Sequence, residues 1–190
     1  MVVIQAIVVM HRIFHRADPV VAAAVIFSRD VYIEGVFDSK QVLPAVREEL
    51  FQKIMESALA IGVGICDNDK VDELNILNAT TLAMKIAISE LKVNPHFIIV
   101  DGNHFKSENK KPKSMNVIQG DEKSFSIAAA SIIAKVTRDK IMAEFEGTYP
   151  QFRFSKHKGY STPEHVGEIG VHGLTEIHRR SFRIRALEIN

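Results

Sequence analysis

The stretch that decides the fold is Phe97-Ile98-Ile99-Val100-Asp101-Gly102-Asn103. Its four leading apolar residues, three of them β-branched, are typical of a short strand buried on both faces of a parallel sheet. The strand runs directly into a carboxylate and a glycine turn. Because open α/β sheets bind their ligands beyond the carboxyl ends of parallel strands, Asp101 is a candidate site residue. A turn-forming role ahead of Gly102 explains the same aspartate equally well.

A second carboxylate repeats this arrangement. Residues 116–119 are expected to form another strand, which ends at Gly120-Asp121. An ordinary helix cap or turn is again the alternative for Asp121. If the two strands are parallel neighbours, both carboxylates lie at one edge of the sheet and are suited to share a divalent cation. Mg²⁺ prefers such hard oxygen ligands and keeps several of its waters.

Apolar and amphipathic segments surround this strand. Strands are expected over residues 2–9, 20–27, 31–36 and 61–66, with Arg29-Asp30 as the hairpin turn before the third. Helices are expected over residues 45–59, from Asp72 as cap to about Leu91, over 126–145, and from Thr162-Pro163 onward. This order predicts an α/β fold with a mixed sheet, an antiparallel meander first and parallel strands later, flanked by helices.

Length and composition indicate one globular domain. The chain has 190 residues, of which 46% are hydrophobic and 25% charged, values that exclude disorder, collagen and coiled coil as descriptions of the whole. A single cysteine, Cys66, cannot form an internal disulfide or a thiolate zinc site, which favours a reducing compartment. The apolar run over residues 1–10 is half a membrane span, and basic residues follow it, the wrong order for a signal peptide. We therefore expect a cytoplasmic protein with no membrane segment.

Positive charge is concentrated in the second half of the chain. Residues 1–100 carry 9 Lys/Arg against 12 Asp/Glu, whereas residues 101–190 carry 15 against 11. This gradient favours a polyanionic partner, with a random surface imbalance as an equal alternative. Within the basic half, the run Lys156-His157-Lys158-Gly159-Tyr160 combines groups that suit phosphates with a ring that suits stacking on a sugar or base. Taken alone, this run favours a solvated loop.

Eight segments, in order along the chain, resemble bacterial ribonuclease HII. They are Pro19–Val25, Asp38–Lys40, Leu74–Thr80, Val100–Asn103, Gly120-Asp121, Ser126–Asp139, Lys156–Tyr160 and Ile177–Phe182. The resemblance implies a ribonuclease H-like fold, with a catalytic domain over residues 1–145 and a substrate-contacting loop and helices over 146–190 in the same compact unit. It also implies an endonuclease that cleaves the RNA strand of RNA–DNA hybrids and cleaves at ribonucleotides embedded in duplex DNA. We expect the protein to be a monomer.

The resemblance further implies roles for single residues. The family holds Mg²⁺ or Mn²⁺ with four carboxylates, of which Asp101 and Asp121 match the third and fourth and are the expected catalytic and metal-binding residues. The family's tyrosine at the junction ribose matches Tyr160. Asp139 is an accessory candidate that serves structure or substrate positioning. The other substrate-binding residues implied by the matching segments are Lys40, Lys156, His157 and Lys158.

The first family motif is missing from this chain. An ungapped count back from Pro19 aligns the family's Asp-Glu pair with Val9-Met10 and its Gly-Arg-Gly turn with residues 12–14. No acidic residue precedes Asp18, which lies too far from the expected pair to be a good substitute. A displaced reading frame over about ten codons is one hypothesis for a departure with such sharp borders.

The chemical consequence of this departure is direct. Valine and methionine side chains offer no hard oxygen to Mg²⁺, so two of the four expected ligands are lost. We therefore expect a nuclease whose activity is strongly impaired. The alternative is a catalytically inactive relative that binds hybrid or duplex nucleic acid without cutting it, and a weaker third alternative is a chain that misfolds.

Overall fold

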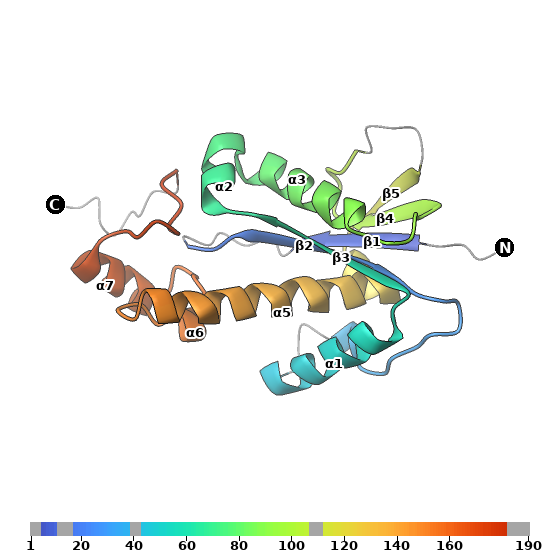
Figure 1. The fold of residues 1–190 in the computed structure, drawn as a ribbon, viewed down its shortest axis with the longest axis horizontal. Helices are drawn as coiled ribbons and strands as arrows, with labels where there is room; N and C mark the ends of the chain where they lie inside the picture. The colour runs from blue at the N-terminus through green and yellow to red at the C-terminus, as the bar shows by residue number, and fades with distance from the viewer. Residues whose placement is uncertain (1–4, 11–16, 39–42, 107–111, 182–190) are drawn as a thin grey trace.

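A computed structural model describes residues 5–10, 17–38, 43–106 and 112–181, and shows one sheet between two layers of helices (Figure 1). The strand order in the sheet is β3-β2-β1-β4-β5. The strands are β1 (Gln5–Met10), β2 (Val20–Ile26), β3 (Ala60–Cys66), β4 (Phe97–Asp101) and β5 (Lys113–Val117). β1, β2 and β3 pair antiparallel, whereas β4 pairs parallel with both β1 and β5. The predicted mixed sheet is confirmed.

Helices cover both faces of this sheet. α2 (Asn68–Leu74) and α3 (Ile76–Ser89) lie on one face, and α1 (Pro44–Ser57) and α5 (Phe125–Thr148) lie on the other (Figure 1). The other helices of the described residues are α4 (Gly120–Lys123), α6 (Phe154–His157) and α7 (Pro163–His172). In the described ranges, none of these helices is long and apolar enough to cross a membrane.

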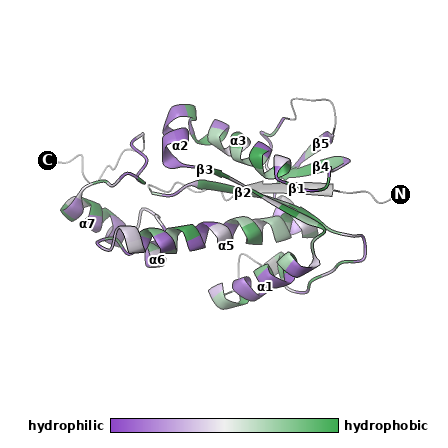
Figure 2. Ribbon diagram, in the orientation of Figure 1, coloured by the Kyte–Doolittle hydropathy of each residue, from purple (hydrophilic) through white to green (hydrophobic). Residues whose placement is uncertain are grey.

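The strand β2 is the centre of the core. All seven of its residues are buried, because its two faces pack against different helices. Val21, Ala23 and Val25 belong to the cluster formed with α5, while the alternate residues of the strand belong to the cluster formed with α3. Figure 2 shows the result, with hydrophobic residues along β2 and β3 and many hydrophilic residues on α1 and α2 outside them. A continuous apolar run, as opposed to an alternating one, is what such two-sided burial requires.

The prediction of a strand over residues 31–36 is wrong. The chain turns at Glu34 and Gly35 and enters the 3₁₀ helix η1 (Val36–Asp38). Ile33 and Val36 are both buried, a spacing of three that does not keep both on one face of a strand, and Gly35 has a φ of 85°. The third strand of the antiparallel meander is β3 instead, which follows α1. The strand expected over 116–119 is β5, which begins three residues earlier.

The prediction of one helix capped by Asp72 is also wrong. Residues 68–89 form two helices, separated at Asn75, which has a φ of 65° and whose side chain accepts the N–H groups of Leu77 and Asn78. Asp72 lies inside α2, where its carboxylate accepts the backbone N–H groups of Arg180 and Ser181. This contact ties the end of the described chain to α2. The predicted cap at Thr162 is confirmed, since its hydroxyl accepts the N–H of His165.

Candidate functional site

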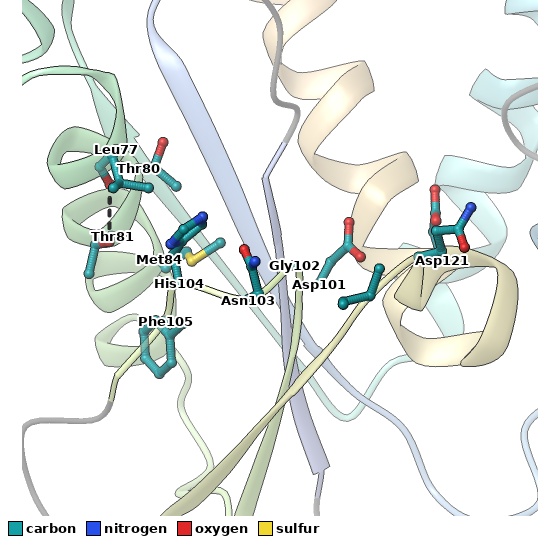
Figure 3. Close-up of a pocket in the computed structure, with 12 residues that line it drawn as sticks. Leu77, Thr80, Thr81, Met84, Asp101, Gly102, Asn103, His104, Phe105 and Asp121 are labelled. Carbon is teal, nitrogen blue, oxygen red and sulfur yellow. Dashed lines mark hydrogen bonds between the residues drawn. The ribbon is translucent and has the colours of Figure 1, made fainter.

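Asp101 and Asp121 line one pocket of about 360 Å³ at the carboxyl end of β4. Figure 3 shows Asp101 and Asp121 on the same side of this pocket, with residues of α3 on the opposite side. The turn after β4 supplies the floor between them. The remaining lining residues are Leu77, Thr80, Thr81, Met84, Gly102, Asn103, His104, Phe105, Ile118 and Gln119. The structure thus brings together the two aspartates that the sequence singled out.

Local geometry explains how the two aspartates meet. β4 and β5 are parallel, with Asp101 in register with Val117, so both strands deliver the chain to the same edge of the sheet. The chain then turns into α4 through Gln119, which has a left-handed φ of 55°. Asp101 Oδ1 accepts the Gly120 N–H at 2.8 Å. That hydrogen bond fixes the Asp101 carboxylate against the residue that precedes Asp121.

Gly120 is required by this close approach. A Cβ atom added at this position would lie 3.2 Å from Asp101 Oδ1 and 2.5 Å from Cδ1 of the buried Ile127. The second distance is shorter than real Cβ contacts allow, so a side chain here would require the buried Ile127 side chain to shift. Asp121 itself is buried, with 7% of its surface exposed.

The donor set of this pocket fits a hard divalent cation. Two carboxylates at one strand edge, one of them buried, supply the oxygen ligands that Mg²⁺ and Mn²⁺ prefer, and water or a phosphate oxygen commonly completes such shells. Among the residues that the structure describes, no group of three or more His, Cys, Asp or Glu side chains is arranged to hold a metal. The carboxylates among the described residues that line the pocket are Asp101 and Asp121.

The register of β1 locates the missing motif. Val8 is in register with Val100 of the parallel strand β4, so the next residue along each strand brings Val9 level with Asp101. Met10 follows as the last residue of β1. The backbone at which the resemblance expects an Asp-Glu pair thus runs beside the Asp101 position, but its residues are apolar. Residues 12–14, where the family's Gly-Arg-Gly turn is expected, lie outside the described residues, as does Lys40.

The basic run before Tyr160 forms a separate cluster. Lys156 is exposed and pairs with Glu164 at 2.8 Å, while Lys158 and Tyr160 are half-buried. Gly159 has a φ of 76°, and a Cβ there would overlap the carbonyl of Ala17. Of the described residues lining the carboxylate pocket, none comes from this segment.

His157 is placed differently from the expectation that it contacts substrate. Its side chain is 1% exposed, and its Nε2 lies 2.9 Å from Glu168 Oε2. Its Nδ1 accepts the N–H of Gly159. Both ring nitrogens are therefore used inside the protein, which assigns His157 to holding this loop in shape.

A buried ionic network supports the same loop and was not predicted. Arg138 extends from α5 beneath the Tyr160 ring, with its Cζ 5.2 Å from the ring centroid, and its Nη2 donates to the Tyr160 hydroxyl at 3.4 Å. Arg138 also pairs with Asp18 at 3.5 Å and with Asp139 at 2.8 Å. Arg179 donates to Asp18 Oδ1 at 2.7 Å. Burial raises the pKa of Asp18 to about 7, although Arg179 and Arg138 lower it.

These contacts show where three residues considered in the sequence analysis lie in the structure. Asp18 is engaged by two arginines and is not directed to the carboxylate pocket. Asp139 pairs with Arg138, which favours the structural side of its predicted accessory role. Arg179, from the matching segment Ile177–Phe182, lies several residues beyond the end of α7 and is buried against Asp18. The partners of Asp18 lie 120 and 161 residues away in sequence, a separation at which local patterns carry no information.

Comparison with known proteins gives consistent matches. The family model described as Ribonuclease HII matches residues 17–185. A protein of Clostridioides difficile named Ribonuclease HII is 50% identical over 166 residues, which are 87% of this chain and 64% of that protein. This chain therefore spans less than two thirds of the length of that relative. The family match begins at residue 17, just after the segment in which the first motif is missing.

Solved structures share the fold. The ribonuclease H2 of Pyrococcus horikoshii superposes with a TM-score of 0.77 at 24% identity and covers 95% of this chain and 94% of its own. Bst-RNase HIII in complex with Mn²⁺ superposes with a TM-score of 0.62 at 18% identity, over 89% of this chain and 63% of that one. At these identities the likeness shows a common ribonuclease H-like architecture.

Proposed function

The chain belongs to the ribonuclease HII family, and from this premise we propose that it binds RNA–DNA hybrids and duplex DNA containing ribonucleotides and hydrolyses them as an impaired endonuclease. Asp101 and Asp121 are the proposed ligands of a Mg²⁺ or Mn²⁺ ion. The observation that carries this proposal is the meeting of these two carboxylates in one pocket at the carboxyl end of β4.

The chemistry assigned to the pocket follows from its charge. When bound, divalent ions activate a water and stabilise the leaving oxygen in phosphodiester hydrolysis. The contribution of this chain is to gather negative charge there, with Asp101 oriented by the Gly120 N–H and Asp121 held by burial on α4. When more than one divalent ion is bound, the negative charge of the two carboxylates offsets part of the repulsion between the ions.

Impairment is proposed because of Val9 and Met10. The register of β1 beside β4 supports the view that a carboxylate at position 9 would stand next to Asp101. With two of the family's four ligands replaced by apolar residues, we expect the hydrolysis rate to fall by several orders of magnitude, as losses from a cooperating catalytic set commonly do. Val9 and Met10 also favour the second candidate function, binding without cleavage, because neither side chain can bind the metal that cleavage requires.

Substrate contact is proposed for residues 146–190, with residues 1–145 as the catalytic part of the same unit. Tyr160 is the proposed partner of the sugar at the RNA–DNA junction, and Lys156, Lys158 and Lys40 are proposed phosphate contacts. The half-exposed Tyr160 ring on a braced loop supports this assignment. We further propose that the chain acts as a monomer and lies in the cytoplasm; the second proposal agrees with its one cysteine, Cys66, which is free and buried.

The test is an incubation of the protein and Mn²⁺ with duplex DNA that carries one ribonucleotide. Slow cleavage on the 5′ side of the ribonucleotide supports the impaired nuclease, and binding without product supports the second candidate. A matched all-DNA duplex is the control for selectivity. Absence of both binding and product with either duplex would contradict both functions.

A further inference from the structure

A buried chain of hydrogen bonds runs from Thr175 to the backbone of Tyr160. The Thr175 N–H and His178 Nδ1 are 2.9 Å apart, the Nε2 atoms of His178 and His165 are 3.1 Å apart, and His165 Nδ1 lies 2.9 Å from the Tyr160 carbonyl oxygen. His165 and His178 are 0% and 1% exposed. The two imidazoles thus connect the segment after α7 with the loop that carries the Tyr160 ring.

The hydrogen bonds in this series all run in one direction, from donor to acceptor, from Thr175 towards Tyr160. The Thr175 N–H can only donate, so His178 Nδ1 accepts and the proton of this ring sits on Nε2. His178 Nε2–H therefore donates to His165 Nε2, which leaves the proton of His165 on Nδ1, aimed at the Tyr160 carbonyl. Both rings must be neutral for this order to hold. Burial lowers the pKa of both histidines to about 4, which agrees with neutral rings at physiological pH.

Neighbouring groups hold the rings in place. His157 stacks on His165 with centroids 4.2 Å apart and planes 13° from parallel. Glu168, whose carboxylate lies 2.9 Å from His157 Nε2, is the acidic group of α7 in this cluster. Phe152 and Phe154 pack against His165 at 6.1 Å and 5.7 Å between centroids. The pair is therefore enclosed by rings and cannot turn away from Tyr160 without disturbing them.

Tyr160 is consequently anchored at both ends. Its carbonyl accepts from His165, while its ring and hydroxyl meet Arg138. The two residues before it, Lys158 and Gly159, have left-handed φ values of 50° and 76°. A positive φ is unfavourable for a residue with a side chain, so Lys158 must be held in this conformation by contacts elsewhere in the protein. Arg138 Nη1 supplies one such contact, because it donates a hydrogen bond to the Lys158 carbonyl at 3.3 Å. The position of the Tyr160 ring is thus set by contacts made well away from its exposed surface.

We propose that His165 and His178 are positioning residues for nucleic-acid recognition, which act by fixing the Tyr160 backbone through the N–H of His165. This inference rests on the proposed function, since it gives the ring a nucleic-acid partner. The histidines do not touch that partner, because both are buried. A pair that only filled space would be replaceable by apolar residues, whereas this pair contributes a directed hydrogen bond.

The test is a double-mutant cycle on the Kd for a fluorescein-labelled RNA–DNA hybrid, measured in Mg²⁺ with the full chain. His165→Leu removes both hydrogen bonds, and His165→Asn keeps a donor near the Nδ1 position. Each is compared in the Tyr160 background and in the Tyr160→Ala background. We expect His165→Leu to raise Kd about tenfold when Tyr160 is present, a change within the range for loss of one stacked ring, and less than twofold when it is absent. His165→Asn should recover most of the loss.

Each outcome separates the two claims. An equal increase of Kd in both backgrounds, or no rescue by His165→Asn, would overturn the positioning role while leaving the proposed function intact. Absence of hybrid binding by the unmodified chain would overturn both. If circular dichroism shows that His165→Leu is unfolded, His178→Gln and His178→Asn replace it, because only the glutamine keeps a donor near Nε2. Kd should then rise for His178→Asn alone, and equal values for the two variants would refute the inference.

Discussion

Restoring carboxylates at positions 9 and 10 is the change whose effect follows most directly from the sheet. Val9 is level with Asp101 on the adjacent parallel strand, so an aspartate there stands one strand spacing, about 4.8 Å, away. Two carboxylates at that distance repel each other by about 3 kcal/mol at an effective dielectric constant of 20. The Val9→Asp/Met10→Glu variant should therefore unfold more easily than the unmodified chain in metal-free buffer, and Mn²⁺ should remove most of that difference.

The same variant should be the better enzyme. Regaining two ligands of a cooperating set should raise the single-turnover cleavage rate on the order of 10³-fold, because such sets lose activity steeply and non-additively when members are removed. The assay follows 5′-side cleavage of duplex DNA with one ribonucleotide at saturating protein and Mn²⁺. Thermal melts with and without Mn²⁺ give the stability difference.

Val9→Asn/Met10→Gln is the matched control, with similar shape and no charge. It should neither cleave faster nor gain Mn²⁺-dependent stability. If the acidic variant cleaves no faster than the amide variant, although both bind hybrid as the unmodified chain does, then positions 9 and 10 do not face the Asp101 pocket and the explanation for impairment is refuted.

Three further predictions concern single features. Gly120→Ala should destabilise the fold by about 1–3 kcal/mol in urea denaturation, because the added methyl overlaps Ile127, and unchanged stability would argue against the tight α4 turn. Tyr160→Ala should weaken hybrid binding by about 1–3 kcal/mol in fluorescence anisotropy, and an unchanged Kd would remove its stacking role. Because burial holds the pKa of His165 and His178 near 4, below the unfolded value of 6.5, their neutral rings stabilise the fold above pH 6.5 and this stability is lost as the pH falls towards 4. Acidification should therefore destabilise the unmodified chain by about 1–3 kcal/mol more than His178→Gln, and parallel pH profiles of the two would contradict this.

Local sequence was sufficient to place Asp101 and Asp121 at the ends of neighbouring strands, because the signals for a strand end are local. The apolar run before Asp101 and the glycine before Asp121 mark strand ends within a few residues, and the structure brings both into one pocket. The assignment of residues 31–36 failed because Ile33 and Val36 are apolar for burial under α5, not for pairing in the sheet. A helical periodicity also concealed the break at Asn75, where one left-handed residue separates α2 from α3.

The buried histidines and arginines that hold the Tyr160 loop could not be predicted from the sequence, for a different reason. His157 was expected on the surface because the run containing it is basic, yet stacking against His165 buries it. Asp18 meets Arg138 and Arg179 across more than a hundred residues of chain, and only the folded structure brings such partners together. The roles of buried histidines and arginines are decided by tertiary packing, on which composition is silent.

The most direct test of the central claim is Mn²⁺ binding to the unmodified chain, to Asp101→Asn and to Asp121→Asn, followed by electron paramagnetic resonance of the free ion. We expect the unmodified chain to bind Mn²⁺ weakly, and either amide substitution to reduce the bound fraction at least tenfold while the melting temperature is kept. Equal Mn²⁺ binding by all three proteins would contradict the assignment of this pocket as the metal site.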